Sequence, residues 1–167
     1  MRDHVSVARP GRFVSGSRVL LGPRYSAGLL ANRSIDINAW KKDVSNRLNA
    51  IRIPWASPVF GRYKPEVTRG CNMAFWRNDL IRVNGYDESF CGWGREDSEL
   101  AIRLDNSGVR QRCMKFRGVV FHLHHGKCER NSLSANEERY QQTIREHRTR
   151  CETGLARHLL SLIHISE

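Results

Sequence analysis

The residues best suited to chemistry lie in one run, GWGREDSEL, at positions 92–100. Two glycines flank Trp93, and two adjacent acids, Glu96 and Asp97, lead into apolar residues. Glycine on both sides permits backbone conformations closed to other residues and leaves the indole free to stand in a cleft, where its apolar face can stack on a sugar or a base. A buried core position is the alternative for this tryptophan.

The two acids open a predicted helix over residues 96–106, EDSELAIRLDN. Acids occupy its first turn, Leu100, Ala101 and Leu104 share one face, and Gly108 follows its end. Backbone N–H groups at a helix start stabilise negative charge, so an ionised carboxylate there can accept a proton from a substrate hydroxyl. The alternative is that the acids are ordinary first-turn residues.

Histidines form a second group with possible chemistry, in KFRGVVFHLHH at positions 115–125. This segment predicts a strand that ends in histidines. Residues two apart on a strand share a face, so His122 and His124 would make a workable metal pair while His125 points away. A structural zinc site that adds Cys113 and Cys128 lacks a standard spacing.

Several further elements must position these residues. Two short strands with a turn at residues 15–17 are predicted near the start, and short helices over 26–53. An ordered loop at 54–66 precedes a buried strand at 71–76, and a short helix follows, with Leu80 and Val83 inward and Gly85 as its left-handed stop. The positions predicted to be buried between 26 and 53 are Leu29, Leu30, Trp40, Val44 and Leu48.

A last helix is predicted from residue 134 to about residue 150. Ser134 and Glu137 have the spacing of a capping box, and Leu133, Tyr140 and Ile144 form a thin apolar stripe. No internal repeat and no low-complexity segment is present in the 167 residues.

Composition limits the classes of function. The chain has the length of one domain, and 28 Lys and Arg against 17 Asp and Glu give a formal net charge of +11, which suits anionic partners such as phosphorylated sugars, nucleic acid or acidic lipid. The arginines are scattered and do not form a stripe with aromatics, so nucleic acid is not the expected partner. Five cysteines without a C-x-x-C pair or a secretory signal favour a reducing, cytoplasmic setting.

Other motifs exclude further classes. No apolar run approaches the roughly 20 residues of a membrane span, and no G-x-G-x-x-G, P-loop, G-x-S-x-G or H-E-x-x-H occurs. We therefore expect a soluble or peripheral protein.

The run RGCNMAFWRNDLIRVNGYDESFCGWGREDSELAIRL, followed by a glycine turn and FHLHH, resembles the C-terminal half of glycosyltransferase family 2 enzymes. The likeness is strongest to the block shared with the β-1,4-galactosyltransferases, and it covers about residues 10–125. It implies an α/β, partial GT-A type (Rossmann-like) fold, the acceptor-side half with a mixed sheet and flanking helices. It also implies a nucleotide-sugar donor, a glycan acceptor and inverting displacement at the anomeric carbon.

Residue by residue, the resemblance implies a general-base role for Asp97 and an acceptor-orienting role for Glu96. Trp93 would line the sugar sites. The other substrate-binding residues that it implies are Asn72, Gly94 and Arg95.

The resemblance also implies a divalent metal, Mn²⁺ or Mg²⁺. His122 would be a ligand, and His124 matches the second histidine of the H-L-H form in some relatives, while His125 stays open as an alternative. Cytoplasmic bacterial members act in lipopolysaccharide or capsule synthesis, so a peripheral place on the cytoplasmic face of the inner membrane is expected.

One departure from the family concerns the donor side. Family members carry an Asp-x-Asp motif in an N-terminal half, and this chain has none. We therefore expect residues 1–150 to be the C-terminal portion of a catalytic domain, residues 151–167 to be a tail of uncertain structure, and the chain alone to be inactive. The rival hypotheses are a basic module that binds nucleic acid or anionic lipid, and a non-catalytic remnant.

Overall fold

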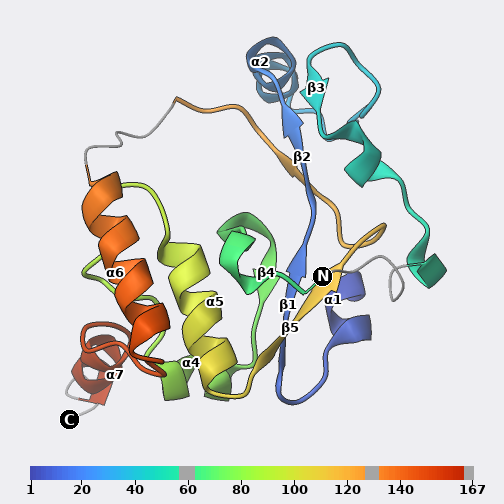
Figure 1. Ribbon diagram of the computed structural model, residues 1–167. Coiled ribbons are helices and arrows are strands. Elements are labelled where there is room, and N and C mark those ends of the chain that lie inside the picture. Colours follow the sequence, from blue (N-terminus) through green and yellow to red (C-terminus); the bar gives the residue numbers. More distant parts are fainter. Residues whose placement is uncertain (57–62, 127–131, 164–167) are drawn as a thin grey trace.

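The computed structural model describes residues 1–56, 63–126 and 132–163 (Figure 1). The described strands form two three-stranded sheets, in the orders β4-β1-β5 and β3-β2-β6. In the first, β1 (Arg12–Gly16) pairs antiparallel with β4 (Met73–Ala74) and parallel with β5 (Arg110–Met114). In the second, β2 (Arg18–Leu21) pairs antiparallel with β3 (Val44–Ser45) and parallel with β6 (Val120–His122).

The two central strands follow one another with only Ser17 between them, and Figure 1 shows β2 continuing the line of β1. Side chains along β1 alternate between two cores, because successive residues of a strand point to opposite faces. Phe13 packs with the cluster on the side of α4 and α5, whereas Val14 packs with Val7 and Met114 on the side of α1.

Helices flank the sheets, and α4, α5 and α6 stand together on one side of β1 and β5 (Figure 1). The α-helices are α1 (Arg2–Val7), α2 (Pro23–Ala31), α4 (Arg77–Val83), α5 (Glu96–Asn106), α6 (Leu133–Arg145) and α7 (Ala156–Ile163). Four 3₁₀ turns complete the described elements: η1 (Arg47–Ala50), η2 (Pro54–Ala56), η3 (Pro65–Val67) and η4 (Gly70–Asn72). Mixed sheets with flanking helices confirm the α/β class.

Helix α5 lies at the centre of this arrangement, and its predicted bounds and inner face are confirmed. Leu100, Ala101 and Leu104 are fully buried against Phe13 and Val83. Burying each leucine contributes roughly 1.5–3 kcal/mol, which anchors the helix and therefore its N-terminus. The short helix α4 is confirmed as well, with Val83 buried and positive φ at both Asn84 and Gly85.

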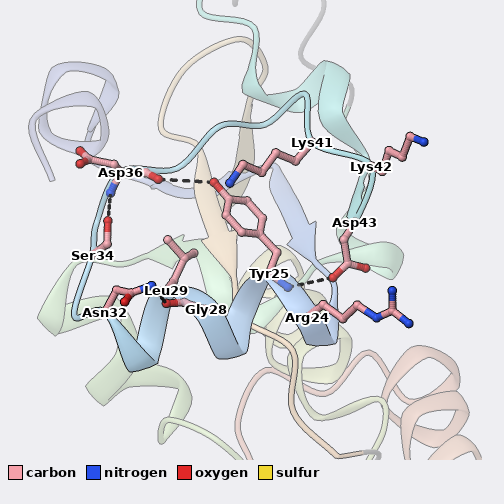
Figure 2. Close-up of a pocket in the computed structure, with 10 residues that line it drawn as sticks. All are labelled: Arg24, Tyr25, Gly28, Leu29, Asn32, Ser34, Asp36, Lys41, Lys42 and Asp43. Atoms are coloured by element: carbon pink, nitrogen blue, oxygen red, sulfur yellow. Dashed lines mark hydrogen bonds between the residues drawn. The ribbon is translucent and has the colours of Figure 1, made fainter.

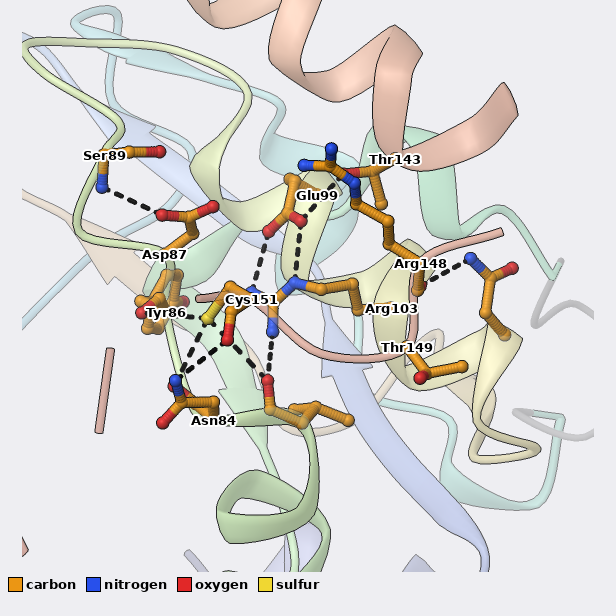
Figure 3. A network of polar contacts seen from close by, with 12 residues as sticks. Asn84, Tyr86, Asp87, Ser89, Glu99, Arg103, Thr143, Arg148, Thr149 and Cys151 are labelled. Atoms are coloured by element: carbon orange, nitrogen blue, oxygen red, sulfur yellow. Dashed lines mark hydrogen bonds and ion pairs between the residues drawn. The ribbon is translucent and has the colours of Figure 1, made fainter. Parts of the chain in front are cut away.

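A buried ion pair joins α5 to its neighbours (Figure 3). Glu99 and Arg103 are 1% and 0% exposed and are linked by two hydrogen bonds of 2.7 and 2.8 Å. Arg103 also donates to the carbonyl oxygens of Val83 and Gly85, and Glu99 accepts from the Thr143 hydroxyl of α6. All the polar atoms of the pair are thus satisfied by three different segments of the chain.

Several predictions for residues 26–53 were wrong. Leu29 and Val44 are buried, but Leu30, Trp40 and Leu48 are 60–64% exposed. Helix α2 turns Ser26 and Leu29, three residues apart, towards the core, so Leu30 points outward. The segment contains one α-helix, a two-residue strand and a 3₁₀ turn instead of several helices.

Other element predictions need correction. The predicted strand at 71–76 is only the two half-buried residues of β4, because η4 occupies the preceding positions. Strand β5 was missed, since RQRCM alternates buried and exposed residues without apolar residues at most positions. Of the predicted loop at 54–66, residues 57–62 lie outside the described residues, and η2 and η3 occupy its ends.

The capping box at the start of α6 was also wrong. Ser134, the predicted cap, lies inside α6, which begins at Leu133 and ends at Arg145 instead of near residue 150. The Glu137 carboxylate accepts from Arg95 and Gln141. A charge-assisted bond to a guanidinium is stronger than a neutral capping bond, which explains the preference. Within the expected tail, residues 151–155 pack against the end of α4 and lead into α7; the boundary at residue 150 stays a prediction.

Candidate active site

The site is built on the sharp turn that leads into α5. Gly92, Gly94 and Arg95 all have positive φ, so the chain passes through left-handed backbone immediately before the helix begins at Glu96. At Gly94, with φ of 117°, an added Cβ would also lie 2.8 Å from Leu133. A glycine is therefore required at this position, and the turn brings Trp93 and the two acids to one end of the helix.

Asp97 is held by two donors from different segments. Its Oδ2 accepts a 2.7 Å hydrogen bond from the backbone N–H of Gly70, and its Oδ1 accepts a 3.1 Å bond from the Tyr86 hydroxyl. A Cβ at Gly70 would lie 2.1 Å from Asp97 Oδ1, so the carboxylate approaches the backbone in a way that only glycine allows. Burial of the Tyr86 hydroxyl and the negative charge of Asp97 hold the pKa of Tyr86 well above its ordinary value.

The neighbouring Glu96 turns back towards the preceding loop, where its Oε2 accepts a 2.9 Å bond from the N–H of Gly94. Arg95 points the other way. Its guanidinium pairs with Glu137 at 2.5 Å and lies over the Tyr140 ring at 4.7 Å. Hydrogen bonds from Gln141 and from Arg95 lower the pKa of the Glu137 carboxyl. The ion pair between Arg95 and Glu137 links the turn before α5 to α6.

These side chains surround a pocket of about 750 Å³. Trp93 lines it and is 40% exposed, so the indole is not a core residue. The pocket combines an aromatic face, a fixed carboxylate and several guanidinium groups, which suits a polyhydroxylated ligand. Its lining consists of Arg18, Glu66, Thr68, Arg69, Trp93, Gly94, Arg95, Glu96, Asp97, Ser98, Leu133, Ser134 and Glu137.

Asn72 does not lie among the residues that line this pocket. It is 3% exposed, and its amide donates to the carbonyl oxygens of Ser17 and Gly118 while His4 bonds its oxygen. Asn72 thus links the residue between β1 and β2 to the connection between β5 and β6 through hydrogen bonds. Its predicted binding of substrate stays a prediction.

The histidines are arranged differently from the strand-based expectation. Strand β6 ends at His122, so the alternation does not continue, and the His122 ring lies 5.0 Å from that of His125. The backbone N–H of His124 donates to the Ser26 hydroxyl, which fixes the chain after the strand. The strand assumed for the pairing of His122 with His124 therefore ends at His122, and the His125 imidazole lies close to that of His122. Metal binding by His122 and His124 stays a prediction.

No group of three or more His, Cys, Asp or Glu side chains within residues 1–56, 63–126 and 132–163 could hold a metal. Mn²⁺ and Mg²⁺ prefer oxygen ligands in octahedral arrangement, whereas His122 and His125 offer two nitrogens. These residues alone do not fit the implied metal.

A second cavity, of about 580 Å³, lies between α2 and the chain that follows it (Figure 2). Lys41 covers the Tyr25 ring at 4.5 Å, and the Asp43 carboxylate accepts from the backbone N–H of Tyr25 in the first turn of α2. None of the predicted site residues lines this cavity, so the candidate site is the pocket beside Asp97.

Comparison with known proteins bears on the same region. Residues 55–126 match the family model described as the N-terminal domain of galactosyltransferase. The matched segment makes up less than half of the 167 residues. It contains Trp93, Asp97 and His122, whereas α6 lies outside it.

Two curated proteins similar to this chain are both named chondroitin sulfate synthase 3. The protein of Homo sapiens is 31% identical over an alignment of 96 residues, and the match covers 44% of this chain and 11% of that protein. The protein of Mus musculus is 30% identical over 96 residues, with the same shares. The chain thus spans about a tenth of the length of these relatives. The family description names an N-terminal domain, and the expected place of the chain in a C-terminal half stays a prediction.

Sequence reasoning missed Gly70, Tyr86 and Glu137, which hold the predicted residues in place. The signal for the first two was weak, because Gly70 begins η4 and Tyr86 lies in a loop, both outside the GWGRED run. No helix among the described residues is long and apolar enough to cross a membrane.

Proposed function

We propose that the Asp97 pocket is the acceptor side of a sugar-transfer site in an inverting glycosyltransferase of GT-A type. The single observation that carries this proposal is the Asp97 carboxylate, fixed by Gly70 and Tyr86 at a pocket that also presents the Trp93 indole. In the GWGRED run, Asp97 acts as general base, Glu96 fixes the loop that orients the acceptor, and Trp93 is the platform for its sugar ring. The match over residues 55–126 supports this assignment.

The reaction is a direct displacement. The acceptor hydroxyl oxygen attacks the anomeric carbon of a nucleotide-sugar donor and forms the new C–O bond, while its proton moves to Asp97. The bond from the anomeric carbon to the diphosphate breaks, and the nucleoside diphosphate leaves with the electron pair. Attack from the opposite face inverts the configuration.

A divalent metal in such a reaction offsets the charge of the diphosphate. His122 and His125 are the imidazoles that this chain could offer it, but they do not form a site alone. The residues of the chain itself bind and orient the acceptor and take its proton. We expect little or no transfer by the isolated chain, because the principal donor and metal carboxylates of the family are absent from it.

The acceptor that we propose is a glycan. A lipopolysaccharide or capsule chain in the bacterial cytoplasm, at the inner face of the inner membrane, is the first candidate. A chondroitin-type glycan is the second, on the name of the two relatives. Arg18, Arg69 and Arg95 line the pocket, which favours an acceptor that carries carboxylate, phosphate or sulfate groups.

Calorimetric titration of the 167-residue chain with a lipopolysaccharide core oligosaccharide and a chondroitin oligosaccharide tests the proposal. We expect one of them to bind, and Asp97→Asn to weaken binding about tenfold or more, because a charge-assisted hydrogen bond to an acceptor hydroxyl is lost. Asp105→Asn is the matched control, since it removes the same charge near the other end of α5.

Three outcomes would contradict the proposal. The first is that neither glycan binds, and the second is that Asp97→Asn binds a glycan as tightly as the unaltered chain does. The third is that the chain binds duplex DNA more tightly than either glycan, with an affinity that falls steeply with salt. Turnover of UDP-hexoses with Mn²⁺ is measured in parallel. Rapid transfer by the isolated chain would contradict its expected inactivity but not the role of Asp97.

A further inference from the structure

The Tyr86 hydroxyl is the only side-chain donor to Asp97 among the bonds of the described residues. Its raised pKa keeps the phenol protonated at neutral and mildly alkaline pH, so the donated bond persists there. Together with the Gly70 N–H on the other oxygen, this bond fixes both ends of the carboxylate. The orientation of Asp97 therefore depends on where the loop at residues 84–88 places Tyr86.

Hydrogen bonds join that loop to residues 148–156, which we name the C-terminal strap. Asn84, 2% exposed and with φ of 68°, is the centre of the contact. Its side-chain nitrogen donates to the Cys151 carbonyl at 2.9 Å, and its side-chain oxygen accepts from the Ala156 N–H at 2.7 Å. Its backbone carbonyl accepts from the N–H of Leu155 at 2.9 Å.

The strap also contacts residues on both sides of Tyr86, and Figure 3 shows Cys151 of the strap beside Asn84 and Tyr86. The N–H of Glu88 donates to the Thr153 carbonyl at 3.1 Å, and the Thr153 hydroxyl bonds the Asp87 carboxylate at 3.2 Å. The buried Cys151 thiol lies 3.5 Å from the Asn84 carbonyl. The loop is thus bonded to the strap at Asn84, which precedes Tyr86, and at Asp87 and Glu88, which follow it.

Gly154 sets how closely the strap approaches. A Cβ at this position would lie 2.2 Å from the carbonyl oxygen of Asn84 and 2.6 Å from that of Tyr86. Both atoms belong to backbone and cannot swing away, so any larger residue must push the strap and the loop apart. Gly154 is therefore the position where a small change in the strap would reach Tyr86.

We propose that Tyr86 is a positioning residue for Asp97 and that the C-terminal strap, through Asn84 and Gly154, places Tyr86 for this task. The inference rests on the proposed function, because it assigns the strap a part in orienting the base. It connects the segment expected to be a tail of uncertain structure with the pocket, although residues 151–155 do not line that pocket. The strap lies outside the matched segment 55–126.

Nuclear magnetic resonance of the chain labelled with ¹³Cζ-tyrosine and ¹⁵N-glycine tests this inference without requiring activity. The Tyr86 ring carbon reports the phenol, and the Gly70 amide reports the opposite oxygen of Asp97. Tyr86→Phe assigns the ring signal and should move the Gly70 amide signal, since the carboxylate then loses one of its two donors. Asp97→Asn should let the Tyr86 phenol ionise at lower pH than in the unaltered chain, because the nearby charge is removed.

Gly154→Ala is the decisive variant. It should shift the Tyr86 ring signal, move the Gly70 amide signal and weaken acceptor binding about tenfold. Gly28→Ala is the matched control, because an added Cβ there meets nothing within 4 Å, and it should leave all three readouts unchanged. Circular dichroism checks that both variants fold; if Gly154→Ala does not, Asn84→Asp, which keeps the shape but replaces the donating nitrogen, is measured in its place.

Unchanged Tyr86 and Gly70 signals in a folded strap variant would overturn the inference. Shifted signals in a chain that binds no glycan would leave the coupling intact and refute the proposed function instead. The two failures are therefore distinguishable.

Discussion

Two carboxylates of α5, only two residues apart, illustrate opposite uses of the same chemical group. Glu99 is 1% exposed and has its charge matched by Arg103 and its lone pairs satisfied by a second helix. Asp97 lies at the pocket, with one backbone and one phenol donor and no cation bonded to it among the described residues. A fully paired buried acid supports the fold, whereas an acid left with acceptor capacity in a pocket can take a proton from a ligand.

The largest effect on stability is expected at Glu99. Glu99→Ala should lower the free energy of unfolding by about 3–5 kcal/mol, because it leaves the Arg103 guanidinium buried and unpaired. Urea unfolding measures the change. Glu138→Ala, which breaks an exposed pair with Arg145, is the control and should cost less than about 1 kcal/mol.

The double variant Glu99→Leu with Arg103→Met separates charge from packing. It should recover part of the loss, since no uncompensated charge remains buried. A double variant as unstable as Glu99→Ala would show that the hydrogen bonds to Val83, Gly85 and Thr143 matter more than the pair itself.

Asp97→Asn should affect stability little and sugar transfer strongly, in contrast to Glu99→Ala. The free energy of unfolding should change by less than about 1 kcal/mol, because the asparagine oxygen can still accept one of the two bonds. Any sugar transfer by a preparation that contains this chain should fall by about 10²–10⁴-fold with loss of the proposed general base. Equal destabilisation by Asp97→Asn and Glu99→Ala would remove the distinction drawn between the two acids.

Gly70→Ala should have an intermediate effect on the pocket. The new Cβ would displace Asp97 and the N–H bond that holds it, so acceptor affinity should fall about tenfold. Calorimetry measures the affinity and urea unfolding the stability. Affinity equal to that of the unaltered chain would mean that the orientation of Asp97 does not matter for binding.

Trp93→Ala should lower the acceptor affinity by a factor comparable to or smaller than that of Gly70→Ala. Loss of a stacking face costs roughly 0.5–1.5 kcal/mol, which corresponds to about a 2- to 13-fold lower acceptor affinity. Trp40→Ala, at a tryptophan that is 60% exposed and does not line the pocket, should leave the affinity unchanged. Equal effects of the two variants would exclude Trp93 as the platform.

The environment of Asp97 could be predicted from the sequence in part, whereas the burial of Glu99 could not. The bounds of α5, its buried face and the gathering of Trp93, Glu96 and Asp97 at one end follow from local pattern, because acids, apolar spacing and a terminal glycine act within one helix. The i, i+4 spacing of Glu99 and Arg103 was visible too, but it does not tell a buried pair from a solvated one. Burial is decided by α4 and α6, which pack there from distant parts of the chain.

Long-range contacts were beyond the sequence pattern for the same reason. Nothing near Gly70, Tyr86 or Gly154 indicates that the three lie around one carboxylate and the loop that positions it. The predicted strand over residues 115–125 was too long, because β6 covers only Val120–His122. Alternation along a strand applies only as far as its partner strand continues the ladder.

The central claim is that the Asp97 pocket receives the sugar acceptor. The most direct test is to titrate the ¹⁵N-labelled chain with the glycan that binds in calorimetry and to follow the indole N–H signals of its four tryptophans. We expect saturable shifts of the Trp93 indole and of the Gly70 and Gly94 amides, and Asp97→Asn should require about tenfold or more higher glycan concentration to produce them. Shifts confined to other residues, or unchanged by Asp97→Asn, would contradict it.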